Sequence, residues 1–274
     1  MTVRVPATSA NLGPGFDVMG LALSLYTEVG ILGVDPLLEG AREADDTHPA
    51  QVAFIRAGGT GRVWVRNSIP MGRGMGFSGA VRIGGAVAAE VQQQGSSWSI
   101  ATSNALAIGT ELEGHADNVA PSLHGGVVIT SENLVVQVPV ALDPVFVMWV
   151  PEFTTSTNES RGKIGPTIAL SDAVFNISRT AMFVTALSTG NVSLLREATR
   201  DRIHQDIRLS ASPACKAALD AGLAAGAWCG WLSGSGPTVA LMCDPTEADR
   251  IAARLPADGH SKILTIDTTG ATVL

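Results

Sequence analysis

The chain has 274 residues, of which 46% are apolar and 16% charged, and its formal net charge is −7. This length is enough for two domains of middling size, and the apolar fraction excludes a disordered chain. The acidic balance argues against a nucleic-acid partner, which needs a basic face. Three widely spaced cysteines without a C-x-x-C pair fit a reducing compartment. With neither a signal-peptide pattern nor an apolar run long enough for a bilayer, we expect a cytoplasmic protein that binds no membrane.

A loop of short polar residues and glycine, 6–17, follows a short strand near the start of the chain. Two apolar residues within it, Leu12 and Phe16, would hold the neighbouring Asn11 and Asp17 in fixed directions. An amide and a carboxylate together suit an ammonium or hydroxyl group. The alternative is an Asx turn, in which these side chains cap local backbone.

The central feature is a glycine-rich run that begins I-P-M-G-R-G-M-G-F-S-G-A at Ile69. A strand is expected before it at 62–66, and a helix opening at about Ser78. Glycine admits backbone conformations closed to other residues, and a helix start aims unpaired N–H groups and a positive dipole end at one point. This order is typical of an anion site, most often for phosphate. The run matches neither G-x-G-x-x-G nor the Walker loop, so a glycine-rich surface turn is the alternative.

A second polar cluster, E-L-E-G-H-A-D-N-V-A-P-S-L-H-G-G, covers 111–126 and follows a predicted helix at 100–112. Its two histidines, His115 and His124, lack the spacing of a paired zinc site. A hard divalent cation held by one carboxylate together with phosphate oxygens fits better, because Mg²⁺ rarely takes an all-protein cage.

The second half of the chain predicts a compact α+β domain. A glycine-rich turn at 233–237 could supply further N–H groups to a ligand. The charged run 200–208 is typical of a solvated helix face on which acids and bases pair weakly. A helix is expected at 172–187, capped by Ser171, and another beginning at Thr246. The remaining expected elements are a helix at 53–57 and strands at 134–140, 145–150, 228–232, 238–243 and 262–266.

Three segments taken together resemble the signature motifs of the GHMP kinases, named for galactokinase, homoserine kinase, mevalonate kinase and phosphomevalonate kinase. They are V-P-A-T-S-A-N-L-G-P-G-F-D at 5–17, P-M-G-R-G-M-G-F-S-G-A at 70–80 and L-S-G-S-G-P-T at 232–238. Within that superfamily, E-G-H-A-D-N-V-A-P-S-L-H-G-G, T-S-T-N-E-S-R, D-A-V-F-N-I-S-R and A-T-R-D-R-I-H-Q most resemble the homoserine kinases. Because these motifs cover most of the chain in the expected order, they disfavour the surface-turn alternative.

The resemblance implies an α+β, two-domain GHMP kinase fold. A ribosomal protein S5 domain 2-like, ATP-binding N-terminal domain would cover 1–143, and a ferredoxin-like C-terminal domain 144–274. The implied reaction moves the γ-phosphoryl group of ATP, with Mg²⁺, to the side-chain hydroxyl of L-homoserine. Its product would be O-phospho-L-homoserine for threonine biosynthesis. The resemblance also implies a homodimer.

Site residues follow from the same motifs, position by position. The nucleotide is assigned to the central loop and its flanks, namely Asn67, Pro70, Gly72, Arg73, Gly74, Met75, Gly76, Phe77, Ser78 and Gly79. Mg²⁺ is assigned to Ser78 and Glu111. The amino-acid substrate is assigned to Asn11, Asp17, His115, Asn118, Thr157, Arg161 and Arg208. The catalytic set around the reacting hydroxyl is His115, Asp117, Asn118 and Arg161. Asp17 would contact the ammonium group of the zwitterion. The planar guanidinium groups of Arg161 and Arg208 would contact its carboxylate.

One position departs from the family pattern. The loop usually carries two serines after its last glycine, and the first of these is Phe77 here. A hydrogen bond to a charged group contributes roughly 1.5–3 kcal/mol, so its loss could slow the enzyme or change its nucleotide or acceptor. Two alternatives follow: a catalytically weak nucleotide- or amino-acid-binding protein, and a GHMP kinase for another small hydroxylated acceptor. The residues also leave open whether Asp117 acts as a base or the hydroxyl proton passes directly to phosphate.

Overall fold

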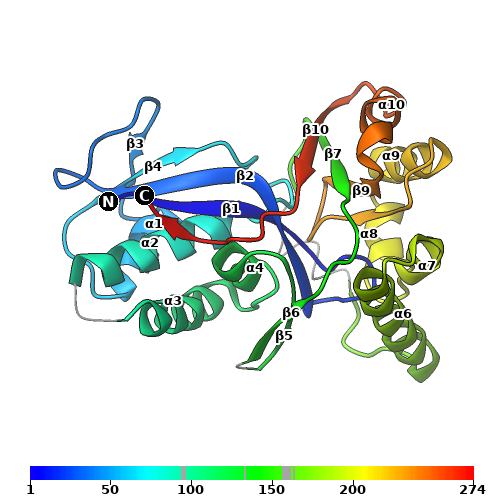
Figure 1. Cartoon of the computed structure of the whole chain (residues 1–274), viewed down its shortest axis with the longest axis horizontal. Helices are drawn as coiled ribbons and strands as arrows, with labels where there is room; N and C mark the ends of the chain where they lie inside the picture. The colour runs from blue at the N-terminus through cyan, green and yellow to red at the C-terminus, as the bar shows by residue number, and fades with distance from the viewer. Residues whose placement is uncertain (94–96, 133, 156–161, 163) are drawn as a thin grey trace.

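The computed structural model of the chain describes residues 1–93, 97–132, 134–155, 162 and 164–274. Two β-sheets lie side by side, each with helices packed against one face (Figure 1). The expected α+β fold of two domains is therefore confirmed. Within the described residues no helix has both the length and the apolar character needed to cross a bilayer.

The first sheet has the strand order β11-β1-β2-β4-β3, with β5 on β2 and β6 on β5. Its strands are β1 Val3–Ala10, β2 Met19–Ile31, β3 Arg42–Glu43, β4 Val63–Asn67, β5 Val127–Ser131, β6 Leu134–Val138 and β11 Thr272–Val273. The long strand β2 pairs in antiparallel register with β1, β4 and β5, so it is the spine of this domain.

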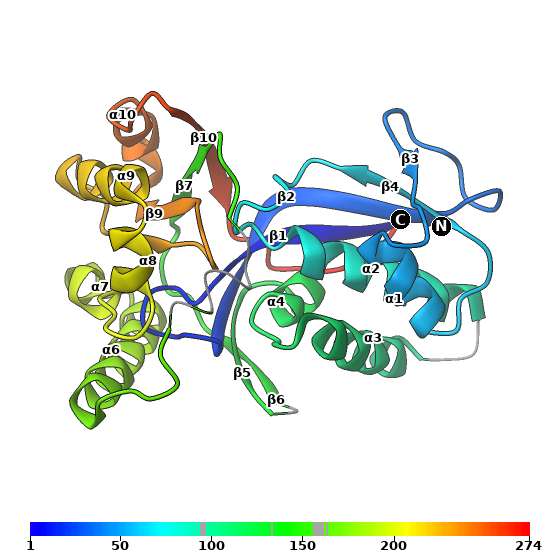
Figure 2. The same ribbon diagram turned by 180° about the vertical axis from the view of Figure 1, so that it is seen from behind.

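Four helices cover one face of the first sheet in both views (Figures 1 and 2). They are α1 Pro49–Arg56, α2 Phe77–Gln93, α3 Trp98–Glu113 and α4 Val119–His124. Helix α2 is buried along most of its length because its residues are small and apolar. It starts immediately after the glycine-rich run, which we call the glycine loop (70–76), so its N-terminus lies at the domain junction.

The second sheet has four antiparallel strands in the order β10-β7-β9-β8. They are β7 Val145–Pro151, β8 Cys229–Leu232, β9 Val239–Cys243 and β10 Gly259–Thr265. In chain order this is fourth, first, third, second, as the ferredoxin-like prediction requires. The helical segments of this domain are α6 Leu170–Thr189, α7 Val192–Ala198, α8 Gln205–Ser210, α9 Pro213–Ala224, the 3-10 turn η1 Pro245–Glu247 and α10 Ala248–Ala252.

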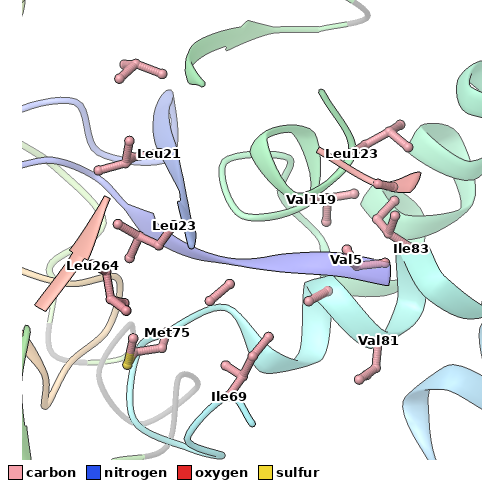
Figure 3. Close-up of a cluster of buried hydrophobic side chains, with 14 of the residues drawn as sticks. Val5, Leu21, Leu23, Ile69, Met75, Val81, Ile83, Val119, Leu123 and Leu264 are labelled. Atoms are coloured by element: carbon pink, nitrogen blue, oxygen red, sulfur yellow. The ribbon is translucent and has the colours of Figure 1, made fainter. Parts of the chain in front are cut away.

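One hydrophobic cluster runs from the first domain into the second. Figure 3 shows Ile69 and Met75, one beside the glycine loop and one within it, pointing into this cluster with Leu264 of β10. The side chains of Ile69 and Met75 are both only 1% exposed. Burying a side chain of this size contributes about 1.5–3 kcal/mol, so the loop is fixed by core packing on both sides.

Several predicted details differ from the structure. Helix α6 has Ala169 at its N-cap without a capping side chain, so Ser171, the predicted cap, lies inside its first turn. Thr246 lies in the turn η1, whose cap is Asp244. The predicted domain boundary at 143/144 falls between β6 and β7. Strand β11, near the end of the chain, pairs with β1 in the first sheet.

Candidate active site

A cleft at the junction of the two domains brings together the motifs identified in the sequence. Its cavity volume is about 130 Å³. Its lining is Asn11, Asp17, Pro70, Gly72, Arg73, Gly74, Met75, Gly76, Phe77, Ser78, Gly79, Glu113, His115, Asp117, Asn118, Thr155, Arg208, Gly234 and Ser235. We call it the interdomain cleft.

The glycine loop follows a path that only glycine permits. Gly72, Gly74 and Gly76 have φ angles of +65°, +70° and +69°. A Cβ on Gly74 would lie 2.2 Å from the Ser233 carbonyl oxygen, and one on Gly76 would lie 1.8 Å from Thr8 Oγ1. Backbone angle and close approach therefore both exclude a side chain at the last two glycines.

Groups of the second domain donate to several of the loop's carbonyl oxygens. Ser233 Oγ donates to the Gly74 carbonyl at 2.6 Å, and the Thr155 N–H donates to the Gly72 carbonyl at 3.1 Å. Arg73 donates to the carbonyls of Pro151 and Glu152 at 3.0 and 2.7 Å. Its guanidinium thus ties the loop to the end of β7. Because these donors are already used, Arg73 has fewer left to neutralise the charge of a bound ligand.

The loop's N–H groups have a different environment. Within the described part of the chain, the N–H groups of residues 72–76 donate no hydrogen bond to a protein acceptor. The first turn of α2 adds its own N–H groups, which no helix can satisfy internally, and the positive end of its dipole. The arrangement suits an anion with several oxygens, such as a phosphate chain.

The second polar cluster lies at the end of α3 and the start of α4. Asp117 is 2% exposed, and its Oδ1 lies 2.5 Å from His115 Nδ1. Asn118 Oδ1 accepts a hydrogen bond from Thr8 Oγ1 at 2.8 Å. The buried carboxylate therefore orients the imidazole, and the side chains of His115 and Asn118 are held at the cleft wall.

The N-terminal loop combines both roles considered for it. Asn11 has φ +70° and is 3% exposed. Its Oδ1 accepts from the Asp17 N–H at 3.1 Å, which closes the turn, while its Nδ2 donates to the Gly234 carbonyl at 2.9 Å. Asp17, with φ +57°, lines the cleft. The amide thus builds the loop and ties it to the second domain, and Asp17 lies at the cleft wall.

Arg208 reaches the cleft from α8, although it is only 6% exposed. Its Nη1 donates to the Gly234 carbonyl at 3.0 Å and lies 3.1 Å from His204 Nδ1. His204 Nε2 in turn lies 2.8 Å from the Gly13 carbonyl. Burial lowers the pKa of His204, so its imidazole is neutral, with Nε2–H donating to Gly13 and Nδ1 accepting from Arg208.

A buried carboxylate supports this arrangement. Asp201 is 4% exposed and accepts from Asn176 Nδ2 at 2.6 Å and from the N–H groups of His204 and Gln205 at 2.8 and 2.6 Å. The prediction of a solvated helix face at 200–208 is therefore wrong for the buried residues Asp201, His204, Gln205 and Arg208. They are buried because α6 and the N-terminal loop pack on them.

The comparisons with known proteins agree with this architecture. Residues 46–126 match the model of the GHMP kinases N terminal domain, and residues 183–261 match that of the GHMP kinases C terminal. The homoserine kinase of Desulfitobacterium hafniense is 38% identical over 99% of this chain and 99% of its own length. The chain belongs to the GHMP kinase family.

Two further members of the GHMP kinase family extend the comparison. The homoserine kinase of Streptomyces coelicolor is 37% identical over 99% of this chain and 94% of its own length. The crystal structure of homoserine kinase from Cytophaga hutchinsonii has a TM-score of 0.85. The superposition covers 100% of this chain and 97% of the Cytophaga hutchinsonii chain, at 24% sequence identity, which establishes the shared fold.

Most of the site residues predicted from the GHMP kinase motifs meet in the interdomain cleft. Those that line it are Asn11, Asp17, Pro70, Gly72, Arg73, Gly74, Met75, Gly76, Phe77, Ser78, Gly79, His115, Asp117, Asn118 and Arg208. Asn67 does not line it, because its amide pairs with the backbone of Ile69 at 2.8 and 2.9 Å. Thr157 and Arg161 lie outside the described residues.

Glu111, the predicted metal residue, lies away from the cleft. Its carboxylate pairs with Arg56 at 2.9 Å, and its side chain is 56% exposed. Glu113 lines the cleft instead. Two residues along a helix correspond to about 200° around its axis, so only one of the two acids can face inward. The signal available in the sequence was the position of Glu113 just before Gly114, where α3 ends.

The magnesium ion that the family implies was tested against the residues at the N-terminus of α2. Ser78 and Glu113 offer a hydroxyl and a carboxylate, which are ligands that Mg²⁺ accepts. However, Arg82 Nη1 donates to Ser78 Oγ at 2.6 Å and pairs with Glu113. As arranged, the oxygens already share a cation and do not fit a divalent ion. Across the described residues, no three or more His, Cys, Asp or Glu are grouped to hold a metal.

Proposed function

We propose that the chain is a homoserine kinase, which transfers the γ-phosphoryl group of ATP to the side-chain hydroxyl of L-homoserine. The product would be O-phospho-L-homoserine, an intermediate of threonine biosynthesis. Support comes above all from the glycine loop, whose N–H groups donate to no protein acceptor among the described residues and which lines the same cleft as Asp17 and Arg208. One wall of the cleft therefore suits a phosphate chain, and the other offers both charges that an amino-acid zwitterion needs.

The phosphate chain of ATP would lie along the glycine loop and the first turn of α2. Phosphoryl transfer requires alignment and compensation of charge on the transferred group rather than covalent chemistry from the protein. Loop N–H groups fixed by core packing require no rearrangement when that charge develops. Mg²⁺ would enter as the counter-ion of ATP.

The amino acid would lie between the N-terminal loop and α8. Asp17 would accept hydrogen bonds from its ammonium group, and Arg208 would donate to its carboxylate as a planar fork. The neutral His204 and the Gly234 carbonyl hold the Arg208 guanidinium in place before the substrate arrives. Thr157 and Arg161 would complete the carboxylate site, as the family resemblance implies.

The reacting hydroxyl would lie beside His115 and Asn118. Asp117 is buried behind His115 and paired with it, so we assign it the role of orienting the imidazole. The hydroxyl proton would then pass to the phosphoryl oxygens directly, or by way of His115 Nε2. A homodimer is proposed from the family resemblance, and light scattering would measure the mass that tests it.

A coupled assay of ADP release would test the function. L-homoserine should be turned over with a kcat/KM well above that of L-threonine, L-serine, mevalonate and shikimate. Preference for one of the other acceptors would favour the alternative of a GHMP kinase with another substrate. No turnover with any of them would remove the enzyme proposal and favour a catalytically weak binding protein, the alternative to which Phe77 at the cleft wall gives weight.

A further inference from the structure

An arginine lies directly behind the two oxygen groups at the start of α2. Arg82 is four residues after Ser78, so the two side chains share one face of the helix. It is the only charged residue from Phe77 to Ala89. Its Nη1 donates to Ser78 Oγ at 2.6 Å, and the same nitrogen pairs with the Glu113 carboxylate at the end of α3.

This ion pair differs from the exposed pair that joins α1 to α3. The side chains of Arg56 and Glu111 are 53% and 56% exposed, as is usual for a surface pair of little energetic weight. Those of Arg82 and Glu113 are 19% and 13% exposed. Removing two charges from water is costly, and burial lowers the pKa of the Arg82 guanidinium. Stability alone is therefore a weak explanation for this pair.

The position of the pair gives a better explanation. A single nitrogen contacts both the hydroxyl and the carboxylate, so it occupies the point from which a metal ion would reach both oxygens. Both Ser78 and Glu113 line the interdomain cleft beside the glycine loop. With Arg82 in place, the carboxylate is neutralised, and a second cation at the same oxygens would be repelled.

We propose that Arg82 is a tethered competitor of the divalent cation at Ser78 and Glu113. In the nucleotide-free protein it keeps free divalent ions away from the glycine loop. A metal ion can bind to these oxygens only after Arg82 has left Glu113. The inference rests on the proposed nucleotide site, but it concerns cation binding alone.

Binding of Mn²⁺ to the nucleotide-free protein tests this competition. MnCl₂ would be added while electron paramagnetic resonance follows the signal of free Mn²⁺. The Arg82→Met variant keeps an apolar stem and removes the charge. Because groups around a metal site alter its affinity about 10–100-fold, R82M should bind Mn²⁺ at least about tenfold more tightly than the unchanged protein. Adding Glu113→Gln should abolish that gain, and Arg56→Met, which breaks the exposed pair between α1 and α3, should leave the affinity unchanged.

Equal or weaker binding of Mn²⁺ by R82M would overturn the proposal, because Arg82 would then only hold Glu113 in place. A gain that persists in the double variant would overturn it too, since the metal would bind elsewhere.

If circular dichroism shows that R82M does not fold, the unchanged protein is compared with E113Q. Equally weak binding by both supports the competition, whereas tight binding that E113Q removes overturns it. A failed kinase assay would leave these results intact, because they involve no acceptor or nucleotide.

Discussion

The two halves of the interdomain cleft are built in different ways. The half beside the glycine loop is made of backbone: three glycines at positive φ, carbonyls that accept hydrogen bonds from both domains, and N–H groups that donate to no acceptor among the described residues. The half beside α8 is made of side chains, in which Asp201, His204 and Arg208 hold one another below the surface. A backbone site tolerates changes of side chain but no added Cβ, whereas the side-chain site depends on each partner in turn.

The largest expected effect is on the backbone half. Gly76→Ala would place a Cβ 1.8 Å from Thr8 Oγ1, so the loop must shift. We expect kcat/KM for ATP to fall by at least about 100-fold, or about 2.7 kcal/mol of transition-state stabilisation. Gly72→Ala is the matched control, because its φ of +65° is similar but its Cβ would meet Thr154 only at 3.5 Å. Gly72→Ala should lose only about 1 kcal/mol of transition-state stabilisation, through backbone strain. If steady-state kinetics showed equal losses of kcat/KM in both variants, backbone strain rather than the steric clash would account for the effect.

The next effect is on the side-chain half. Arg208→Lys keeps the charge but loses the planar fork that donates to Gly234 and, in the proposal, to the substrate carboxylate. A charge-assisted hydrogen bond contributes roughly 1.5–3 kcal/mol, so the KM for homoserine should rise about 10- to 100-fold. The KM for ATP should stay within about twofold. Arg202→Lys is the control, since its side chain is 47% exposed. Parallel rises in both KM values would disqualify Arg208 as the carboxylate partner.

A smaller effect concerns pH. Burial lowers the pKa of His204 below its ordinary value of 6.5. As the pH falls, this histidine is therefore protonated in the unfolded chain at a higher pH than in the folded protein. The free energy of unfolding should therefore be independent of this residue above pH 6.5 and fall as the pH drops below it. Urea unfolding between about pH 5 and 8 measures this.

The His204→Gln variant should show a shallower loss of stability in acid. Burial also lowers the pKa of His48 and His124, so part of the slope should persist. His260→Gln, whose histidine side chain is 51% exposed, should leave the slope unchanged. A slope that is the same in H204Q and the unchanged protein would show that the side-chain half does not depend on a neutral His204.

The smallest expected effect returns to the loop. Phe77 packs edge-on against His48, with ring centroids 6.1 Å apart, and lines the cleft at the first turn of α2. Phe77→Ser restores the usual hydroxyl, but a site made of backbone N–H groups should gain little from it. We expect kcat to change by less than about threefold, or under about 0.7 kcal/mol. A tenfold or larger gain in rate would instead favour the catalytically weak binding protein.

The sequence predicts best those parts of the site whose structure is set by backbone conformation. The glycines of the loop could be recognised because the residue type itself encodes the conformation, and a helix that starts near Ser78 follows directly. The loop's anchoring through Arg73 could not be foreseen, since Pro151 and Glu152 are about 80 residues away in the chain.

The side-chain half was harder to predict for a physical reason. Alternating acids and bases at 200–208 look like a solvated face, and nothing local reveals that Asn176 and Gly13 will supply hydrogen bonds. Similarly, Glu111 and Glu113 are chemically alike, and only the phase and end of α3 decide which one reaches the cleft. Burial of a charged residue is a property of the tertiary fold.

The return of β11 to the first sheet has a mechanical consequence. The chain crosses from the first domain to the second after β6 and crosses back after β10. The backbone groups of Thr2 and Leu274 then hydrogen-bond to each other. Two chain segments therefore join the domains, and the second is held to the first sheet by the pairing of β11 with β1. Because the hydrophobic cluster also spans both domains, the relative position of the two cleft walls is set by packing as well as by these connections.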